Sequence, residues 1–263
     1  MTSPNRSYHP SKEIIQASST NIGRLFESVV DQAHTAVAII ENNRTMTYGE
    51  LNDRVNKLAN GLLDKGIKHG DRIALLTRNC AAYLEIELAC AKAGIILVSL
   101  NWRLTQEEVK HCLNATQPKL IFAAIEFQKL LPNSSEIQNI LFHTEYENLL
   151  RKSSNKKITD IVNGEDGLVI IFTSGTTGLP KGALISHRAI ITRALIFAEE
   201  TSAPKQDTFI AWTPLFHMGS NDFSLATLLR GGQVVIIDGY QPEEIIKTIE
   251  TYPIHYLLSL IHI

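Results

Sequence analysis

Apolar positions along the first half of the chain predict helices and strands in alternation. In residues 47–66, an apolar stripe at helical spacing follows Thr47 and Glu50, which are spaced as in an N-terminal capping box. Thr105 and Glu108 show the same spacing ahead of another periodic segment. Short apolar runs between such segments predict strands. The predicted helices are residues 21–34, 47–66, 81–94 and 105–116, and the predicted strands are residues 36–40, 71–77, 95–100 and 119–124.

The second half of the chain resumes this alternation after a polar stretch. Residues 132–166 are polar and irregular around one predicted strand at residues 139–142. Beyond them, the predicted strands are residues 167–172, 183–186, 207–214 and 233–238, and the predicted helices are residues 187–200, 222–232 and 242–250. Because the strands are apolar on both faces and separated by helices, the pattern predicts an α/β fold of layered, largely parallel sheets with helices on both faces. We expect the second alternating block to be part of another α/β layer.

The composition is typical of a soluble globular protein. The 263 residues are 44% hydrophobic and 20% charged, and the formal net charge of -2 gives no electrostatic reason to expect nucleic acid as a partner. No apolar run approaches the ~20 residues of a membrane span, so we expect no transmembrane segment. Three cysteines without a C-x-x-C pair suit a reducing cytoplasm better than a disulfide or zinc scaffold. We expect residues 1–20 to be a loose tail.

One segment, TSGTTGLPKG at residues 173–182, contains candidate binding chemistry. It differs from the Walker phosphate motif because Pro180 precedes the lysine and Gly182 follows it. Its predicted setting is strand–loop–strand, in which backbone N–H groups, hydroxyls and an ammonium group can surround phosphate oxygens. The candidate phosphate-binding residues are Thr173, Ser174, Gly175, Thr176, Thr177, Gly178 and Lys181. By composition alone, a flexible surface turn explains the same residue types equally well.

The ordered string T-S-G-T-T-G-x-P-K-G is far more specific than its composition. It resembles, without a mismatch, the phosphate-loop signature of the adenylate-forming superfamily. Residues 47–113 resemble the beginning of a family member throughout, and TPLFHMGS at residues 213–220 resembles the family's second core motif. The resemblance implies a two-step reaction. A carboxylic acid attacks the α-phosphate of ATP, with Mg²⁺, to give an acyl-adenylate and pyrophosphate, and the thiol of coenzyme A then displaces AMP.

The resemblance also implies roles for individual residues. Residues 173–178 and Lys181 would hold the β- and γ-phosphates of ATP, and Phe216 and His217 would line the side on which the carboxylate enters. We expect Lys181 and His217 to be catalytic, because the first step requires charge stabilisation on the polyphosphate more than a protein nucleophile. No metal ligand is assigned in this chain.

Two other polar groups stand close to predicted strand ends. Asn101 and Arg103 follow the strand at residues 95–100, where α/β sheets place their sites, but a loop that closes onto the next helix is the interpretation we favour. His187 and Arg188 follow a short predicted strand, and we expect them to be structural.

The resemblance covers the start of a longer protein. It makes residues 21–257 a partial AMP-binding N-terminal domain of two α/β subdomains, the second incomplete, with the C-terminal domain absent. The adenine, ribose and Mg²⁺ ligands would then lie beyond residue 263. The final residues, LSLIHI, are what the string CTG TCT CTT ATA CAC ATC would encode, and that string matches a transposon end used in library preparation. We hypothesise that residues 258–263 are a non-native tail, whereas a short natural terminus or a frameshift is the alternative; other codons in the source DNA would exclude the tail hypothesis.

Three functions follow as hypotheses. The first is an AMP-forming acyl-CoA synthetase that acts on a fatty or aryl acid, with a small carboxylic acid and coenzyme A as partners. The second is an adenylation module that loads an amino or aryl acid onto a carrier protein. The third is a non-catalytic nucleotide-binding fragment. For all three, we expect the 263-residue chain to be inactive by itself, because a cut sheet exposes an edge.

Overall fold

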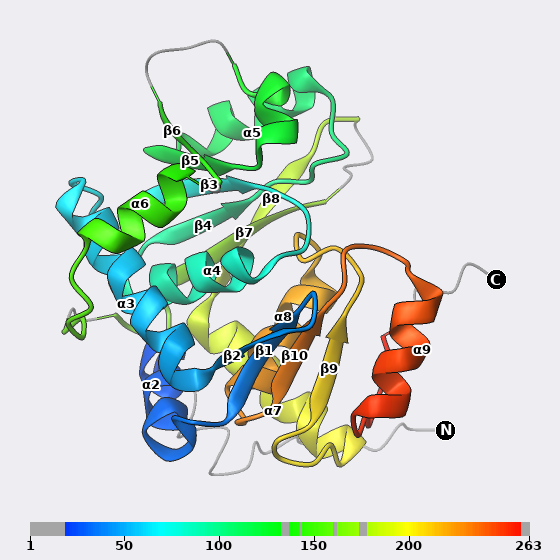
Figure 1. The fold of residues 1–263 in the computed structure, drawn as a ribbon. Coiled ribbons are helices and arrows are strands. Elements are labelled where there is room, and N and C mark those ends of the chain that lie inside the picture. The colour runs from blue at the N-terminus through cyan, green and yellow to red at the C-terminus, as the bar shows by residue number, and fades with distance from the viewer. Residues whose placement is uncertain (1–18, 133–136, 143, 160–161, 174–177, 259–263) are drawn as a thin grey trace, which may run out of the picture.

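Two β-sheets organise the chain, and the larger one has six strands. The computed structural model describes residues 19–132, 137–142, 144–159, 162–173 and 178–258. The strands of the larger sheet are β3 (Arg72–Leu76), β4 (Ile96–Ser99), β5 (Leu120–Ala123), β6 (Gln138–Leu141), β7 (Gly167–Thr173) and β8 (Lys181–Ser186). Their order across the sheet is β6-β5-β3-β4-β7-β8 (Figure 1). Every neighbouring pair is parallel except β7 and β8, which are antiparallel.

The smaller sheet joins strands from both ends of the chain. Its strands are β1 (Val37–Glu41), β2 (Arg44–Thr47), β9 (Thr208–Ala211) and β10 (Gln233–Ile236), in the order β2-β1-β10-β9. β10 is parallel to both β1 and β9, whereas β2 is antiparallel to β1. The predicted α/β fold of layered, largely parallel sheets is therefore confirmed.

Helices cover both faces of each sheet. They are α2 (Ile22–Ala33), α3 (Tyr48–Asp64), α4 (Ala81–Ala93), α5 (Gln106–Thr116), α6 (Thr144–Lys152), α7 (His187–Thr201), α8 (Met218–Leu228) and α9 (Pro242–Thr251). On the larger sheet, α5 shares one apolar cluster with β4 and β5, and α3 and α4 pack on the opposite face. On the smaller sheet, Ile245 of α9 packs on one face and α8 on the other. No helix in the described part of the chain is long and apolar enough to cross a membrane.

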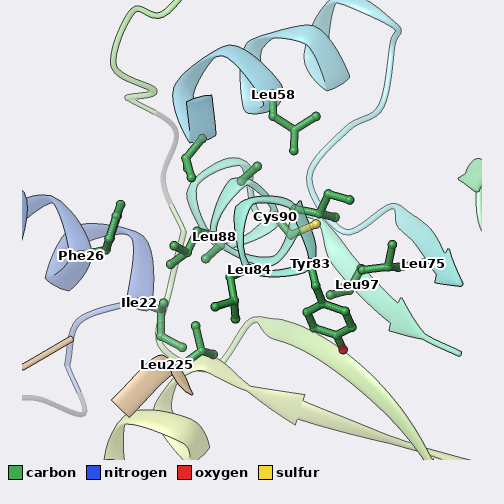
Figure 2. Close-up of a cluster of buried hydrophobic side chains, with 14 of the residues drawn as sticks. Ile22, Phe26, Leu58, Leu75, Tyr83, Leu84, Leu88, Cys90, Leu97 and Leu225 are labelled. Carbon is green, nitrogen blue, oxygen red and sulfur yellow. The ribbon is translucent and has the colours of Figure 1, made fainter. Parts of the chain in front are cut away.

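The main core surrounds α4, which lies between the two sheets in Figure 1. Figure 2 shows side chains from several elements around this helix, among them Phe26 of α2, Leu58 of α3 and Leu225 of α8. All of α4 except Ala82 is buried. A helix that is buried all round presents no polar stripe, so its sequence reads as a nearly continuous apolar run. Burial of each leucine contributes roughly 2 kcal/mol relative to exposure.

The structure corrects the sequence-based prediction at several elements. Residues 144–152, which we expected to be irregular, form α6, and β2 was not predicted. α6 has only two buried residues, Tyr146 and Leu150, so its apolar stripe is too narrow to stand out. The short 3-10 helix Ile125–Leu130 was also not predicted. These elements contribute few buried side chains to the core, so their apolar periodicity is weak in the sequence.

Candidate functional site

The site is built where several strands end. Parallel strands place their carboxyl ends at the same edge of a sheet, and polar loops follow β3, β4 and β7 there. Ser99, the last residue of β4, is paired with Ile171 of β7. Thr173, the first residue of the candidate phosphate loop, lies two residues after Ile171 on β7. It is therefore next to the loop that follows Ser99 and β4. This register brings the phosphate-loop segment and the Asn101–Arg103 segment to the same edge.

The candidate phosphate loop connects two antiparallel strands, as the sequence predicted. Thr173 at the end of β7 is paired with Lys181 at the start of β8, so the hydroxyl-bearing residue and the lysine lie across from each other at the mouth of the hairpin. The side chain of Lys181 is exposed. The predicted phosphate ligands Ser174, Gly175, Thr176 and Thr177 lie outside the described residues.

Two glycines of this hairpin have a physical reason to be glycine. Gly178 has φ +90, a conformation that side chains with a Cβ rarely adopt, and the position where its Cβ would be is open space. At Gly182, an added Cβ would come within 2.9 Å of Ile170 Cγ2. The base of the hairpin is also held from outside, because His111 Nε2 of α5 lies 3.2 Å from the carbonyl oxygen of Pro180. The hairpin is thus held at Pro180 by His111, and the space beside Gly178 is open.

Phe216 and His217 lie in the turn between β9 and α8. The backbone N–H of His217 donates to the carbonyl of Pro214 at 3.0 Å, and His217 is the N-cap residue of α8, without a hydrogen bond from its side chain to the helix. Phe216 is buried, and its ring meets that of Trp102 edge-on at a centroid distance of 6.4 Å. The imidazole of His217 is exposed. The α8 terminus therefore leaves this side chain available to a ligand.

The electrostatic setting of His217 links it to the β4 loop. Desolvation lowers the pKa of His217, and the positive charge of Arg103 lowers it further. We had expected Asn101 and Arg103 only to close a loop onto the next helix. The side chain of Asn101 makes a local bond within this loop, since its Oδ1 accepts from the backbone N–H of Arg103 at 2.8 Å. Arg103, however, also faces the site, and its local sequence carried no sign of that long-range contact.

An arginine–aromatic stack completes this edge. Trp102 has Arg78 Cζ at 4.2 Å and Arg103 Cζ at 4.8 Å from its ring centroid, and its ring stacks on Phe127 at 5.8 Å. Guanidinium groups over aromatic rings are favourably placed and keep their charge. Sequence reasoning missed Arg78, Trp102 and Phe127, because their association depends on strand order and leaves no local pattern.

The arrangement suits an anionic ligand. Arg78 follows β3, Arg103 follows β4 and Lys181 begins β8, and Thr173 adds a hydroxyl. Arg78 Nε also lies 3.9 Å from Asp238 Oδ2. Within the described residues, no cluster of three or more His, Cys, Asp or Glu side chains could hold a metal ion. These groups provide positive charge and a hydroxyl, which are the chemistry that an anion requires, whereas no metal ligand set is assembled among the described residues.

Comparisons with known proteins identify the family of this chain. A family model described as AMP-binding enzyme matches residues 26–260. A feruloyl-CoA synthase of Amycolatopsis sp is 31% identical over 82% of the chain and 43% of its own length. The fatty acid–[acyl-carrier-protein] ligase ScoC of Streptomyces coeruleorubidus is 29% identical over 82% of the chain and 43% of its own length. The chain thus spans less than half the length of either relative.

A solved structure supports the fold. The N-terminal domain of FACL13 from Mycobacterium tuberculosis, in an inhibitor-bound crystal structure, superposes with a TM-score of 0.82 at 24% identity. The superposition covers 88% of this chain and 61% of that one. At this identity, the likeness is one of fold.

Proposed function

Because the chain belongs to the AMP-binding enzyme family, we propose that it is the N-terminal part of a ligase that activates a carboxylic acid with ATP. The acid attacks the α-phosphate of ATP, an acyl-adenylate forms and pyrophosphate leaves. Transfer of the acyl group to the thiol of coenzyme A then releases AMP. The observation that carries the proposal is the hairpin of β7 and β8, with Thr173 opposite an exposed Lys181 and open space beside Gly178.

We assign the polyphosphate to this hairpin. Thr173, Ser174, Gly175, Thr176, Thr177, Gly178 and Lys181 would hold the β- and γ-phosphates through N–H, hydroxyl and ammonium groups. Fixed donors aimed at developing charge lower a reaction barrier without reorganisation during the step. Lys181 would therefore contribute to catalysis as well as to binding, because it faces the charge that builds on the departing pyrophosphate. Mg²⁺ would supply additional charge neutralisation, and its ligands are not assigned to the described residues.

We assign the carboxylate of the acid to the other side of the site. His217 is exposed at the start of α8, and its lowered pKa favours a neutral imidazole that can donate one hydrogen bond without neutralising the acid. Buried Phe216 would form an apolar wall beside the acid, supported by Trp102. The carboxylate must stay ionised to act as the nucleophile, so a neutral donor is the better neighbour for it.

The acid is proposed to be fatty or aryl, since relatives named for both kinds match this chain. A carrier-protein thiol in place of coenzyme A is the second candidate, and the similarity to a fatty acid–[acyl-carrier-protein] ligase favours it. We propose a cytoplasmic location, which the three free cysteines Cys80, Cys90 and Cys112 support.

The test compares Lys181→Ala with Lys68→Ala in the complete enzyme, with acyl-CoA formation followed over a panel of fatty and aryl acids. Lys68 is exposed at the opposite, amino-terminal end of β3 and is the matched control. Loss of the ammonium group at residue 181 should raise the KM for ATP and lower kcat by about tenfold or more, because at least one charge-assisted contact worth roughly 1.5–3 kcal/mol is removed. The Lys68 variant should retain wild-type kinetics. An unchanged ATP dependence in Lys181→Ala would contradict the loop assignment.

A further inference from the structure

One buried amide joins the two sheets at the site. Asn79 lies in the turn between β3 and α4 and is buried. Its Nδ2 donates to the carbonyl oxygens of Ala211 at 3.1 Å, Thr213 at 2.8 Å and Ile237 at 3.2 Å. Its Oδ1 accepts from the backbone N–H of Leu215 at 2.8 Å. Both N–H bonds and the carbonyl oxygen of the amide are therefore in use.

These contacts cross from one sheet to the other. Asn79 follows β3 of the six-stranded sheet, whereas its partners follow or end β9 and β10 of the four-stranded sheet. Ala211 is the last residue of β9, and Ile237 directly follows β10. Of these acceptors, the carbonyl of Ala211 also accepts from the backbone N–H of Ile237 at 3.2 Å, within the four-stranded sheet. A single side chain thus makes four hydrogen bonds that connect the end of β3 to the segments after β9 and β10.

The held segment leads directly to the candidate carboxylate site. Thr213 and Leu215 lie within the four residues before His217, and the turn closes with the hydrogen bond from His217 to Pro214. The residues that face this segment, Trp102 beside Phe216 and Arg103 near His217, lie in the loop after β4 of the six-stranded sheet. The placement of His217 relative to them consequently depends on how the 211–217 segment is held against the six-stranded sheet.

We propose that Asn79 is a positioning residue that locks the Phe216–His217 turn against the six-stranded sheet and so aligns the carboxylic acid with the polyphosphate. The alignment rests on the proposed function, whereas the lock itself does not. Reacting groups must be held in a near-attack geometry, and a small displacement lowers the rate strongly. In this proposal Asn79 acts through His217 and does not itself touch a reacting atom.

The first experiment follows the imidazole of His217 by NMR titration in the 263-residue chain. Asn79→Ala removes the lock, and Asn79→Ser retains a hydroxyl that can replace one bond. We expect the pKa of His217 to rise in Asn79→Ala, because the freed turn moves the ring into solvent and away from Arg103, with Asn79→Ser in between.

The matched control is Asn60→Ala. Nδ2 of Asn60 also donates to three carbonyl oxygens, those of Asn56 at 2.9 Å, Ser154 at 2.9 Å and Lys156 at 2.8 Å, but these lie away from the 211–217 segment. Its loss should leave the titration of His217 unchanged. An identical His217 titration in wild type and in either folded Asn79 variant would overturn the lock, and so would an equal shift in Asn60→Ala.

The second experiment measures kinetics in the complete enzyme. Asn79→Ala should lower kcat/KM for the acid by about tenfold or more. The change in KM for ATP should be smaller, because the β7–β8 hairpin is part of the six-stranded sheet and not of the turn that Asn79 holds. Equal losses for acid and ATP would contradict the positioning role. If the wild-type enzyme activates no acid, the proposed function fails, and the His217 titration still decides whether Asn79 holds the turn.

Discussion

Glu87 places a carboxyl group in the buried interface of α4 and α8. It is fully buried, and its Oε2 accepts from Asn221 Nδ2 at 2.7 Å. Burial raises the pKa of Glu87 to about 8, against the hydrogen bond from Asn221, and the negative charge of Asp222 raises it further. The native protein therefore keeps this group protonated at neutral pH. Ionisation of this carboxyl group in the folded protein would place an unpaired charge in the core and would be unfavourable.

This carboxyl group should make stability depend on pH. An unfolded chain ionises Glu87 near pH 4.5, whereas the native chain does so only near pH 8. Between these values unfolding releases a proton, so this group's contribution to the free energy of unfolding falls by up to about 1.4 kcal/mol per pH unit as pH rises. Glu87→Gln, which cannot ionise, should gain stability relative to wild type from about pH 5 to pH 8.

Urea unfolding of wild type and Glu87→Gln over that range provides the measurement. Glu107→Gln, at an exposed glutamate in the first turn of α5, is the control and should keep the wild-type pH dependence. Parallel pH profiles for wild type and Glu87→Gln would show that Glu87 ionises in the native state as it does in the unfolded state.

At the scale of single residues, local patterns find only part of the site. The ordered string around Lys181 was sufficient to predict a strand–loop–strand hairpin, and the hairpin is present. Arg103 and Asn79 could not be assigned in the same way. Their partners are about 110–160 residues away in sequence, and only the strand order brings them together. A polar residue at a strand end indicates the right edge of a sheet but does not identify its partner.

At the scale of single elements, two helices begin with the capping boxes that the sequence indicated. Thr47 with Glu50 at α3 and Thr105 with Glu108 at α5 both form the reciprocal hydrogen bonds that their spacing predicted. α8 lacks such a signal, since His217 at its N-cap makes no side-chain cap bond. The predicted helix begins at residue 222, whereas α8 begins at Met218. A histidine at the cap position, in place of Ser, Thr, Asp or Asn, removes the usual marker of a helix start.

The α5 capping box should contribute measurably to stability. Thr105→Ala removes the acceptor for the backbone N–H of Glu108 and should lower the free energy of unfolding by about 1 kcal/mol. Thr105→Ser should retain most of this stability, because its hydroxyl can still accept from the N–H of Glu108. In urea unfolding, Thr35→Ala, at an exposed turn after α2, is expected to change little. A Thr105→Ala variant as stable as wild type would mean that water satisfies this helix terminus equally well.

At the scale of the whole molecule, α4 is the element that both sheets share. Its leucines, Leu84 and Leu88, lie on the side of the helix that faces Ile22 of α2 and Leu225 of α8 in Figure 2. The sequence predicted α4 as a helix and predicted two α/β layers, but periodicity could not show that β1 and β2 join β9 and β10. Strand order depends on which apolar faces fit together across the whole chain, and a local pattern does not contain that information.

Truncation of this shared core should be costly. Leu84 is completely buried, and Leu84→Ala should lower the free energy of unfolding by about 2–5 kcal/mol through lost burial and the cavity that remains. Ile246→Ala removes a side chain that is 55% exposed on α9 and should cost below about 0.5 kcal/mol. Denaturant unfolding of the 263-residue chain compares the two. Similar costs for both variants would show that α4 is not the common core.

Acid-dependent exchange of labelled pyrophosphate into ATP is the most direct measurement of the proposed activity, because it reports acyl-adenylate formation and needs no thiol acceptor. With the complete enzyme and a panel of fatty and aryl acids, we predict exchange that requires one of these acids and is reduced about tenfold or more by Lys181→Ala. We predict no exchange from the 263-residue chain alone. Absence of exchange with every acid, or full exchange in Lys181→Ala, would contradict the assignment of the β7–β8 hairpin as the polyphosphate site.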